Sequence, residues 1–327
     1  MNTIGRVFRV SIYGESHGPS LGVLVDGVPA GLPLSAEDFA EDLARRRSGQ
    51  PGTTARREQD TPMFKSGIFN GRSTGAPLMV QFDNRDVDSS PYESTKTLPR
   101  PGHADWTAWQ KFRGFNDYRG GGHFSGRLTA GLVAAGIIAK KIIAPATVNA
   151  SVLEVGGSRD YEPLIREALA AGDSLGGVVE CRVRQLPAGL GEPFFDPLES
   201  LISHIVFAIP AIKGIEFGAG FAAARMRGSE MNDNIIDQSG TTATNNAGGI
   251  NGGISNGNEI VFRIAVKPAS SIALRQQTID LRTGQPAEIQ VRGRHDAAIA
   301  LRVPVVLEAA TAIALADALL ILKTVNP

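Results

Sequence analysis

Residues 14–18 read Gly14-Glu15-Ser16-His17-Gly18 and follow the short apolar segment Arg6 to Tyr13. This pentapeptide places an imidazole between two glycines, so backbone and side chain can both approach a ligand closely. The flanking segments, residues 5–12 and 21–28, predict two strands joined by this turn. Glycines also mark ordinary turns between strands, so the pentapeptide alone is equally consistent with a surface histidine.

Two further segments place a histidine close to a turn glycine. Pro101-Gly102-His103-Ala104-Asp105 has a carboxylate two residues after its histidine, and Gly293-Arg294-His295-Asp296 combines a cation, an imidazole and a carboxylate. Three of the five histidines therefore lie in glycine-flanked loops, a placement that suits acid–base chemistry. His204 instead falls within the apolar pattern of a predicted helix at 198–207, and we expect it to be structural.

The charge composition favours a small anionic ligand. The chain of 327 residues has a formal net charge of zero, which argues against a non-specific nucleic-acid coat. Of its 33 basic residues 25 are arginine, and several of these lie in predicted loops. Planar guanidinium groups bind carboxylates and phosphates bidentately, whereas for any single arginine a solvated salt bridge is the commoner role.

Several functional classes are disfavoured. The single cysteine, Cys181, lies in an apolar run, so we expect a packing role and no disulfide within the chain. The N-terminus has no signal-peptide core, and the apolar run Leu128 to Ala139 is too short to span a bilayer, so we expect a soluble, cytoplasmic protein. No metal-ligand spacing, Walker motif, dinucleotide motif or Gly-x-Ser-x-Gly elbow appears.

The remaining pattern mixes helices and strands. Ser35-Ala36-Glu37-Asp38 resembles a capping box and starts a helix that runs into Arg45-Arg46-Arg47. The glycine-rich run Tyr118 to Arg127 opens an apolar helix that ends at Ile143, and glycines there expose backbone N–H groups to an anion. Further strands are expected at 76–82, 148–155, 178–183, 214–218, 259–266 and 287–291, and further helices at 163–171, 198–207 and 304–322.

Two polar segments carry less regular patterns. Residues 84–99 are expected to be irregular. The glycine- and asparagine-rich segment Asn245 to Gly257 predicts either a backbone that wraps closely around a flat or phosphorylated group, or a long irregular turn.

In combination these motifs resemble chorismate synthase, and they occur in that family's order over nearly the whole chain. The segments that carry the resemblance are Gly14 to Gly18, Val25 to Gly31, Arg45 to Arg47, Arg100 to Asp105, Asp117 to Gly122, Pro187 to Pro193, Asn246 to Gly257, Lys267 to Ser271 and Gly293 to Asp296. The resemblance implies an α+β fold with helices sandwiched between antiparallel β-sheets, formed by one domain over residues 1–327 and assembled as a homotetramer.

The implied activity is that of a carbon–oxygen lyase acting on phosphates. It would convert 5-enolpyruvylshikimate 3-phosphate to chorismate in the last step of the shikimate pathway, on the way to the aromatic amino acids. The family requires reduced FMN although the reaction has no net redox change, so the flavin would lend and recover an electron. The chain has no appended reductase domain, so we expect the monofunctional kind, supplied with reduced flavin by an external system.

The resemblance also implies roles for individual residues. His17 would protonate the departing phosphate, His103 would be the proton partner of the reduced flavin, and Asp296 would help the flavin to accept the ring proton. The substrate anions would be bound by Arg46, Arg100, Arg127 and Arg294. The flavin would be surrounded by His123, Phe124, Ser125, Pro210, Ala211, Gly252, Lys267, Pro268, Ala269, Ser270, Ser271 and Arg294. No metal is implied.

The sequence departs from the family pattern in two loops. Where members usually read Arg-Ser-Ser-Ala-Arg-Glu-Thr, this chain reads His123-Phe124-Ser125-Gly126-Arg127-Leu128-Thr129, so one arginine and one glutamate are absent. The loop after Arg47 is one residue shorter than in some relatives, and it lacks an arginine for which Arg56 or Arg57 could substitute. These departures bear on flavin and substrate affinity.

Two alternatives remain at this point. An NADPH-dependent flavin reductase would oxidise NADPH without a shikimate substrate, with arginines binding the 2′-phosphate of NADP. A non-enzymatic anion-binding module would be indifferent to His17→Ala and His103→Ala. The placement of two histidines and Asp296 in three separate glycine-flanked loops favours the lyase.

Overall fold

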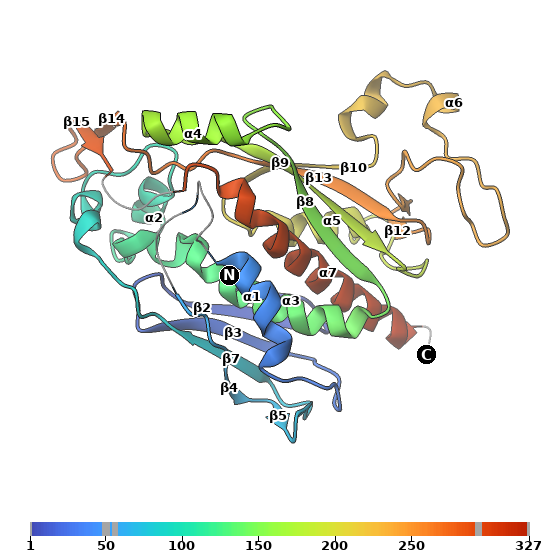
Figure 1. The fold of residues 1–327 in the computed structure, drawn as a ribbon. Coiled ribbons are helices and arrows are strands. Elements are labelled where there is room, and N and C mark those ends of the chain that lie inside the picture. The colour runs from blue at the N-terminus through green and yellow to red at the C-terminus, as the bar shows by residue number, and fades with distance from the viewer. Residues whose placement is uncertain (1, 48–52, 54–57, 292–295, 326–327) are drawn as a thin grey trace.

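The chain folds into two antiparallel sheets with a layer of helices between them (Figure 1). The structure is a computed structural model that describes residues 2–47, 53, 58–291 and 296–325. Helices α3 and α7 pack against each other in the middle layer, where α3 also contacts β3 of one sheet and α7 contacts β8 and β9 of the other. The predicted α+β sandwich is therefore confirmed.

Both sheets are antiparallel throughout. The N-terminal sheet has the order β1-β2-β3-β7-β4, with strands β1 (Thr3–Ile4), β2 (Arg9–Gly14), β3 (Ser20–Asp26), β7 (Leu78–Asp83) and β4 (Met63–Ser66). The second sheet has the order β10-β13-β9-β8, with strands β10 (Ile212–Phe217), β13 (Ile260–Val266), β9 (Gly177–Arg184) and β8 (Thr147–Val155). Three hairpins are formed by β5 (Ile68–Phe69) with β6 (Arg72–Ser73), β11 (Ile250–Asn251) with β12 (Ile254–Ser255), and β14 (Arg275–Ile279) with β15 (Pro286–Gln290).

The helices differ in length and exposure. The α-helices are α1 (Ala40–Arg46), α2 (Asp105–Phe112), α3 (Thr129–Ile143), α4 (Glu162–Ala171), α5 (Leu198–Val206), α6 (Gly228–Met231) and α7 (Val303–Val325). Short 3₁₀ turns are η1 (Glu37–Phe39), η2 (Ser90–Lys96), η3 (Arg119–Phe124), η4 (Gly126–Leu128), η5 (Gly220–Arg225) and η6 (Ile299–Arg302). Residues 84–99, expected to be irregular, thus contain the turn η2.

Small side chains let the two central helices approach closely. A Cβ at Gly136 of α3 would lie 2.3 Å from the Cβ of Ala309 on α7, so only glycine fits there. Residues Ile299–Val325 are long and apolar enough to cross a membrane, but 72% of the relevant window is buried inside this fold. Its apolar surface is therefore covered mainly by α3, α5 and the second sheet, as expected of a core helix.

The strand predicted at residues 5–12 is correct only in part. Strand β2 begins at Arg9, and the backbone N–H groups of Arg6, Val7 and Phe8 instead donate to the carboxylate of Asp317 on α7, at 2.9, 2.7 and 2.8 Å. Those three groups therefore cannot join a β-ladder. The bond to Asp317 ties the N-terminal segment to the central helix layer.

The pentapeptide Gly14 to Gly18 joins β2 to β3 as predicted, with Gly14 paired to Leu21. In strand β3 every second side chain points into the core, and Leu21, Val23 and Val25 are fully buried. Each such side chain contributes roughly 1.5–3 kcal/mol of hydrophobic stabilisation. The core thereby fixes the end of β2 from which the loop with His17 projects.

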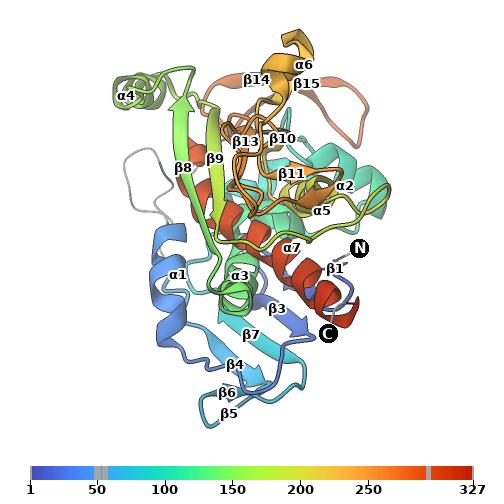
Figure 2. The same cartoon turned by 90° about the vertical axis from the view of Figure 1, so that its right-hand side faces the viewer.

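The segment that includes η5 and α6 stands away from the two sheets in Figure 1, and α6 projects at the top of Figure 2. The hairpin β11–β12 carries Gly252 at its turn, where a Cβ would meet nothing within 4 Å. The segment Asn245 to Gly257 thus contains a short hairpin, and a close fit of its backbone around a flat or phosphorylated group stays a prediction.

Candidate functional site

One large cavity, about 1270 Å³ in volume, lies where loops from both halves of the chain meet. A single small ligand needs roughly 300–1,000 Å³, so the cavity has room for a substrate together with a cofactor. Its polar wall includes Ser16, Arg46, Arg47, Glu58, Gln59, Tyr92, Arg100, His103, Gly120, His123, Ser125, Arg127, Asp296 and Arg302. Its apolar wall is formed by Phe124, Phe207, Ala208, Ile209, Pro210, Ala211, Ile212, Ile299, Val303 and Val306.

Two adjacent glycines separate the two histidines that the sequence singled out. A Cβ at Gly120 would lie 2.4 Å from Nε2 of His17, and a Cβ at Gly121 would lie 3.5 Å from Nε2 of His103. Both glycines have positive φ, 58° and 82°, which side chains rarely adopt. The glycine run thus brings together imidazoles that are 86 residues apart in sequence (103 − 17). His17 is only 9% exposed and lies behind Gly120, which lines the cavity.

A buried carboxylate holds two of the predicted substrate-binding arginines. Asp60 forms ion pairs with both Arg46 and Arg127, and the three side chains are 0%, 6% and 4% exposed. Burial disfavours the ionised form of Asp60, but the two guanidinium charges outweigh it and lower its pKa. Burial in turn lowers the pKa of Arg46, although Asp60 opposes this. One carboxylate therefore serves two cations, and an anionic ligand would balance the remaining charge.

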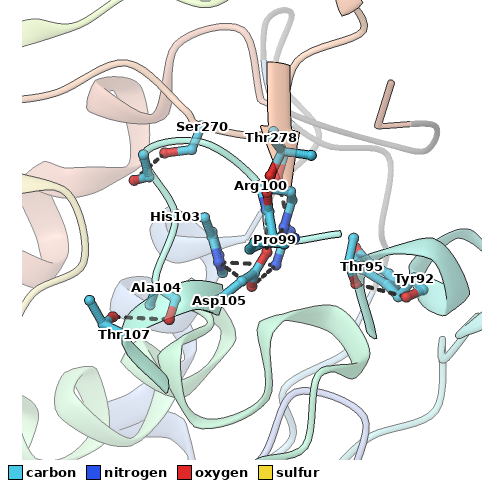
Figure 3. Close-up of polar contacts among 12 residues, drawn as sticks. Tyr92, Thr95, Pro99, Arg100, His103, Ala104, Asp105, Thr107, Ser270 and Thr278 are labelled. Atoms are coloured by element: carbon cyan, nitrogen blue, oxygen red, sulfur yellow. Dashed lines mark hydrogen bonds and ion pairs between the residues drawn. The ribbon is translucent and has the colours of Figure 1, made fainter. Parts of the chain in front are cut away.

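Arg100, His103 and Asp105 form a second compact cluster at the N-terminus of α2 (Figure 3). Asp105 accepts from Nε and Nη2 of Arg100, both at 2.8 Å, and lies 2.6 Å from Nδ1 of His103. Burial opposes ionisation of Asp105, but the bonds from Arg100 and His103 hold its pKa well below the usual range. Burial and the charge of Arg100 lower the pKa of His103, against the effect of Asp105.

This geometry fixes the orientation of His103. An ionised Asp105 requires a hydrogen on Nδ1, so the 3.1 Å contact of that nitrogen with Arg100 is a packing contact and not a second hydrogen bond. The neutral imidazole then has its lone pair on Nε2, the nitrogen that faces Gly121. His103 can accept a proton from the cavity at neutral pH.

The loop Lys267 to Ser271 closes the cavity beside this cluster. Nζ of Lys267 donates to the carbonyl of Gly102 at 2.5 Å and to Oγ of Ser270 at 2.6 Å, and Arg100 donates to Oγ of Ser271 at 3.0 Å. Burial and the nearby charge of Lys213 lower the pKa of Lys267. The loop is thereby bonded to the turn that carries His103.

Asp296 also lines the cavity and forms an ion pair with Arg302 at the end of η6. Within the described part of the chain, the buried Nε atoms of Arg302 and Arg46 have no hydrogen-bond partner. Both arginines line the cavity, so their guanidinium groups border the space that an anion would enter. Among the described residues, no group of His, Cys, Asp and Glu could hold a metal ion.

Most of the predicted site residues border the same cavity. These are His103, Asp296, Arg46, Arg100, Arg127, His123, Phe124, Ser125, Pro210, Ala211, Lys267, Pro268, Ala269, Ser270 and Ser271. Gly252 is not among the described residues that line it, and Arg294 lies outside the described part of the chain, as do Arg56 and Arg57. His204 is exposed on α5, and Cys181 is fully buried, with its pKa raised to about 12 by desolvation.

The departure after the glycine run has a local structural role. Nδ1 of His123 bonds to the carbonyl of Gly14 at 2.8 Å, and Nε2 lies 3.2 Å from Oδ1 of Asn2. Leu128, at the usual glutamate position, is 7% exposed. His123 therefore connects the glycine run to the turn that carries His17.

Sequence reasoning missed five residues of the site: Asp60, Asn84, Ser89, Tyr92 and Arg302. All lie in segments without a motif or a hydrophobic period. Only Asp60 could have been suspected from the sequence. It is a carboxylate that shortly follows the arginine-rich end of a predicted helix, which suggests a salt bridge to one of those arginines.

The chain is similar to chorismate synthases along its whole length. The family model described as chorismate synthase matches residues 8–320. A chorismate synthase of Chitinophaga pinensis is 59% identical over 327 residues, covering 100% of this chain and 98% of that protein. One of Methanosarcina mazei is 46% identical over 358 residues, covering 100% and 98%. A crystal structure of chorismate synthase has a TM-score of 0.73 and 28% identity, covering 98% of this chain and 93% of that one.

Proposed function

The chain belongs to the chorismate synthase family, and on that premise we propose how its residues divide the work of the family's reaction. The reaction is the last step of the shikimate pathway, in which 5-enolpyruvylshikimate 3-phosphate loses phosphate and a ring proton to give chorismate. The enzyme is thus a lyase acting on a small molecule, and its family implies a flavin requirement. The cofactor we propose is FMN in its reduced form.

The substrate's two carboxylates and phosphate would be bound by the arginines of the polar wall. Arg46 and Arg127 are held by Asp60, and Arg100 is held by Asp105, so their guanidinium groups are oriented before a ligand arrives. Arg294 is proposed as a further ligand from the family resemblance alone.

The cavity fits a flat cofactor beside the substrate. Residues Phe207 to Ile212 and Ile299 to Val306 supply an apolar wall, and the loop Lys267 to Ser271 supplies hydroxyls and backbone groups next to it. Reduced FMN, when bound, would supply the electron that the elimination borrows and returns. Residues 123–125, Pro210 and Ala211 would contact it, whereas the family position Gly252 lies outside this cavity.

Three residues would handle protons. His17, one glycine behind the cavity wall, would give a proton to the departing phosphate, and the phosphate charge would favour the protonated imidazole before transfer. His103, neutral and with its lone pair on Nε2, would accept a proton from the reduced flavin. Asp296 would assist removal of the ring proton, positioned by Arg302.

The observation that carries this proposal is the convergence of Arg46, Arg100, Arg127, His103 and Asp296 on one cavity from four distant segments. The test is anaerobic turnover with dithionite-reduced FMN and 5-enolpyruvylshikimate 3-phosphate, following chorismate and phosphate together. Equal amounts of both products are expected, with loss in Asp296→Ala and His103→Ala and with oxidised flavin. His204→Ala, on the exposed face of α5, is the control.

Failure would have distinct forms. No product despite binding of flavin and substrate would overturn the proposal. Oxidation of NADPH without the shikimate substrate would instead indicate a flavin reductase, in which NADP occupies the arginine wall. Normal turnover of both substituted enzymes would reject the assigned residues and leave the family's reaction in place.

For assembly and location we propose a cytoplasmic homotetramer of one-domain chains that takes flavin reduced by another protein. Phe221, Ile235 and Ile236 support self-association, since they are exposed on the segment that stands away from the sheets. Light scattering of the purified chain tests the assembly. A monomer at micromolar concentration would contradict it.

A further inference from the structure

We propose that Asn84, Ser89 and Tyr92, in the segment that follows β7, are positioning residues for His17. Asn84 would fix the backbone of the loop that carries the imidazole, and Ser89 would fix which ring nitrogen holds the proton. This inference rests on the proposed role of His17 as proton donor, but its main test does not depend on turnover.

Asn84 connects the loop that carries His17 to Arg127 on the polar wall of the cavity. Its Nδ2 donates to the carbonyls of Glu15 and Gly18, at 3.0 and 2.8 Å, so one amide holds the loop on both sides of His17. Its Oδ1 accepts from Nε of Arg127 at 3.0 Å. A single side chain therefore sets the distance between the imidazole and an arginine of the cavity.

Ser89 contacts the imidazole itself. Its Oγ lies 2.8 Å from Nδ1 of His17, on the far side of the ring from Nε2. Nε2 faces Gly120, the glycine that borders the cavity, where any side chain would clash with the ring. The ring is thus held by one nitrogen and directed toward the cavity by the other.

Tyr92 limits rotation of the ring. Its aromatic ring meets that of His17 edge to face, with centroids 5.3 Å apart and an interplanar angle of 89°. The guanidinium carbon of Arg100 lies 5.8 Å from the same tyrosine centroid. Tyr92 therefore lies against both His17 and Arg100, and it lines the cavity.

The contact with Ser89 has a chemical consequence. In proton donation the Nε2–H bond breaks and an O–H bond forms on the leaving phosphate, while Nδ1–H remains and donates to Ser89. The neutral product is then the Nδ1–H tautomer. Ser89 favours that tautomer when its Oγ accepts the hydrogen bond, so the proton that the ring gains and loses is the one on Nε2, the nitrogen that faces the substrate side.

The test is the ¹⁵N–¹H spectrum of the histidine side chains in the full-length protein at pH 8, with His17 assigned by its loss in His17→Asn. We expect Nδ1–H in the wild type, a shift toward Nε2–H in Ser89→Ala, and recovery in Ser89→Thr, which keeps the hydroxyl. Ser90→Ala is the matched control, because Ser90 is exposed and bonds to Asp88. An Nε2–H tautomer in the wild type, or an unchanged Ser89→Ala spectrum, would overturn the proposal.

Kinetics separate the two contacts. Ser89→Ala should lower kcat about tenfold with little change in KM, because only proton delivery is impaired. Asn84→Asp keeps the acceptor for Arg127 but loses both donors to the loop, so kcat should again fall more than KM rises. A change in KM alone in either enzyme would contradict positioning. A changed tautomer with unchanged kcat would uphold the positioning and reject His17 as the proton donor.

Discussion

Glu308 of α7 accepts hydrogen bonds from both terminal nitrogens of Arg45, at 2.8 and 2.6 Å. Arg45 directly precedes Arg46, so this pair anchors the end of helix α1 from which Arg46 enters the cavity. Glu308 is 2% exposed and also accepts from Lys140 at 2.9 Å and from the backbone of Ala150 at 3.0 Å.

Replacing Glu308 with Ala should reduce the free energy of unfolding by about 3 kcal/mol, because two cations lose a buried partner. Chemical denaturation measures this. Glu162→Ala is the control, since the Glu162 side chain is 81% exposed and its ion pair with Arg166 is long, at 3.9 Å. Its effect on the free energy of unfolding should stay below about 0.5 kcal/mol. Equal effects of the two substitutions would show that Glu308 does not anchor the helix.

Asp60→Asn removes the charge that Arg46 and Arg127 share. The free energy of unfolding should fall by about 3 kcal/mol, since the two buried guanidinium groups then repel each other uncompensated. Inorganic phosphate should raise the melting temperature of this variant more than that of the wild type, because an anion can replace the carboxylate. Asp26→Asn, in an exposed pair with Arg9, is the control. An equal phosphate effect in all three proteins would contradict this arrangement.

His103 makes stability depend on pH in a defined window. Burial lowers its pKa, so the unfolded chain takes up a proton at higher pH than the folded one. Its contribution is therefore present above the unfolded value, roughly 6.5, and is lost as the pH falls through the folded value. Asp105 has its pKa lowered below the usual range and contributes to acid sensitivity only below about pH 4.

The melting temperature should thus fall between pH 7 and pH 5, and it should fall less in His103→Gln. His204→Gln, with an exposed side chain, should follow the wild type. If the melting temperature of His103→Gln falls as much as that of the wild type between pH 7 and pH 5, the imidazole is not buried in its neutral form.

Gly120→Ala should abolish most turnover while the fold persists. The added methyl group would lie 2.4 Å from Nε2 of His17 and 2.8 Å from Oγ of Ser16, so the ring must move. We expect kcat to fall about a hundredfold, within the range for loss of an acid–base group. Gly71→Ala is the matched control, because its φ is also positive, 69°, but nothing lies within 4 Å of the new methyl group. Similar losses in both would indicate backbone strain as the cause.

The sequence predicted the elements that are governed by local periodicity. The predicted strand at 178–183 lies within β9, the one at 259–266 begins one residue before β13, and the apolar helix after the glycine run is α3. Residues 14–18 form a turn because an apolar strand precedes them and another follows. Residues Arg6 to Phe8 belong to a predicted strand but do not form one. Their N–H groups donate instead to the carboxylate of Asp317, more than 300 residues away in the sequence.

For the site, local sequence marked the residues with distinctive chemistry in glycine-flanked loops, His17, His103 and Asp296, and the arginines of the polar wall. It could not tell Arg45 from Arg46, because adjacent helix positions point about 100° apart and only packing shows which faces the cavity. The reaction, the cofactor and the role of each residue came from the family resemblance, because hydrophobic periodicity carries no information about them.

Only the tertiary structure identified the residues that hold the site in place. Asp60, Asn84 and Ser89 are polar loop residues without a motif, and each contacts a partner distant in sequence. Asp60 and Asn84 both bond to Arg127, and Ser89 bonds to His17. Hydrogen bonds and ion pairs extend over about 3 Å, so they form wherever folding brings atoms together and leave no period in the sequence. The sequence by itself thus determined the main helices and strands and the reactive groups, whereas the packing of loops determined how those groups are oriented.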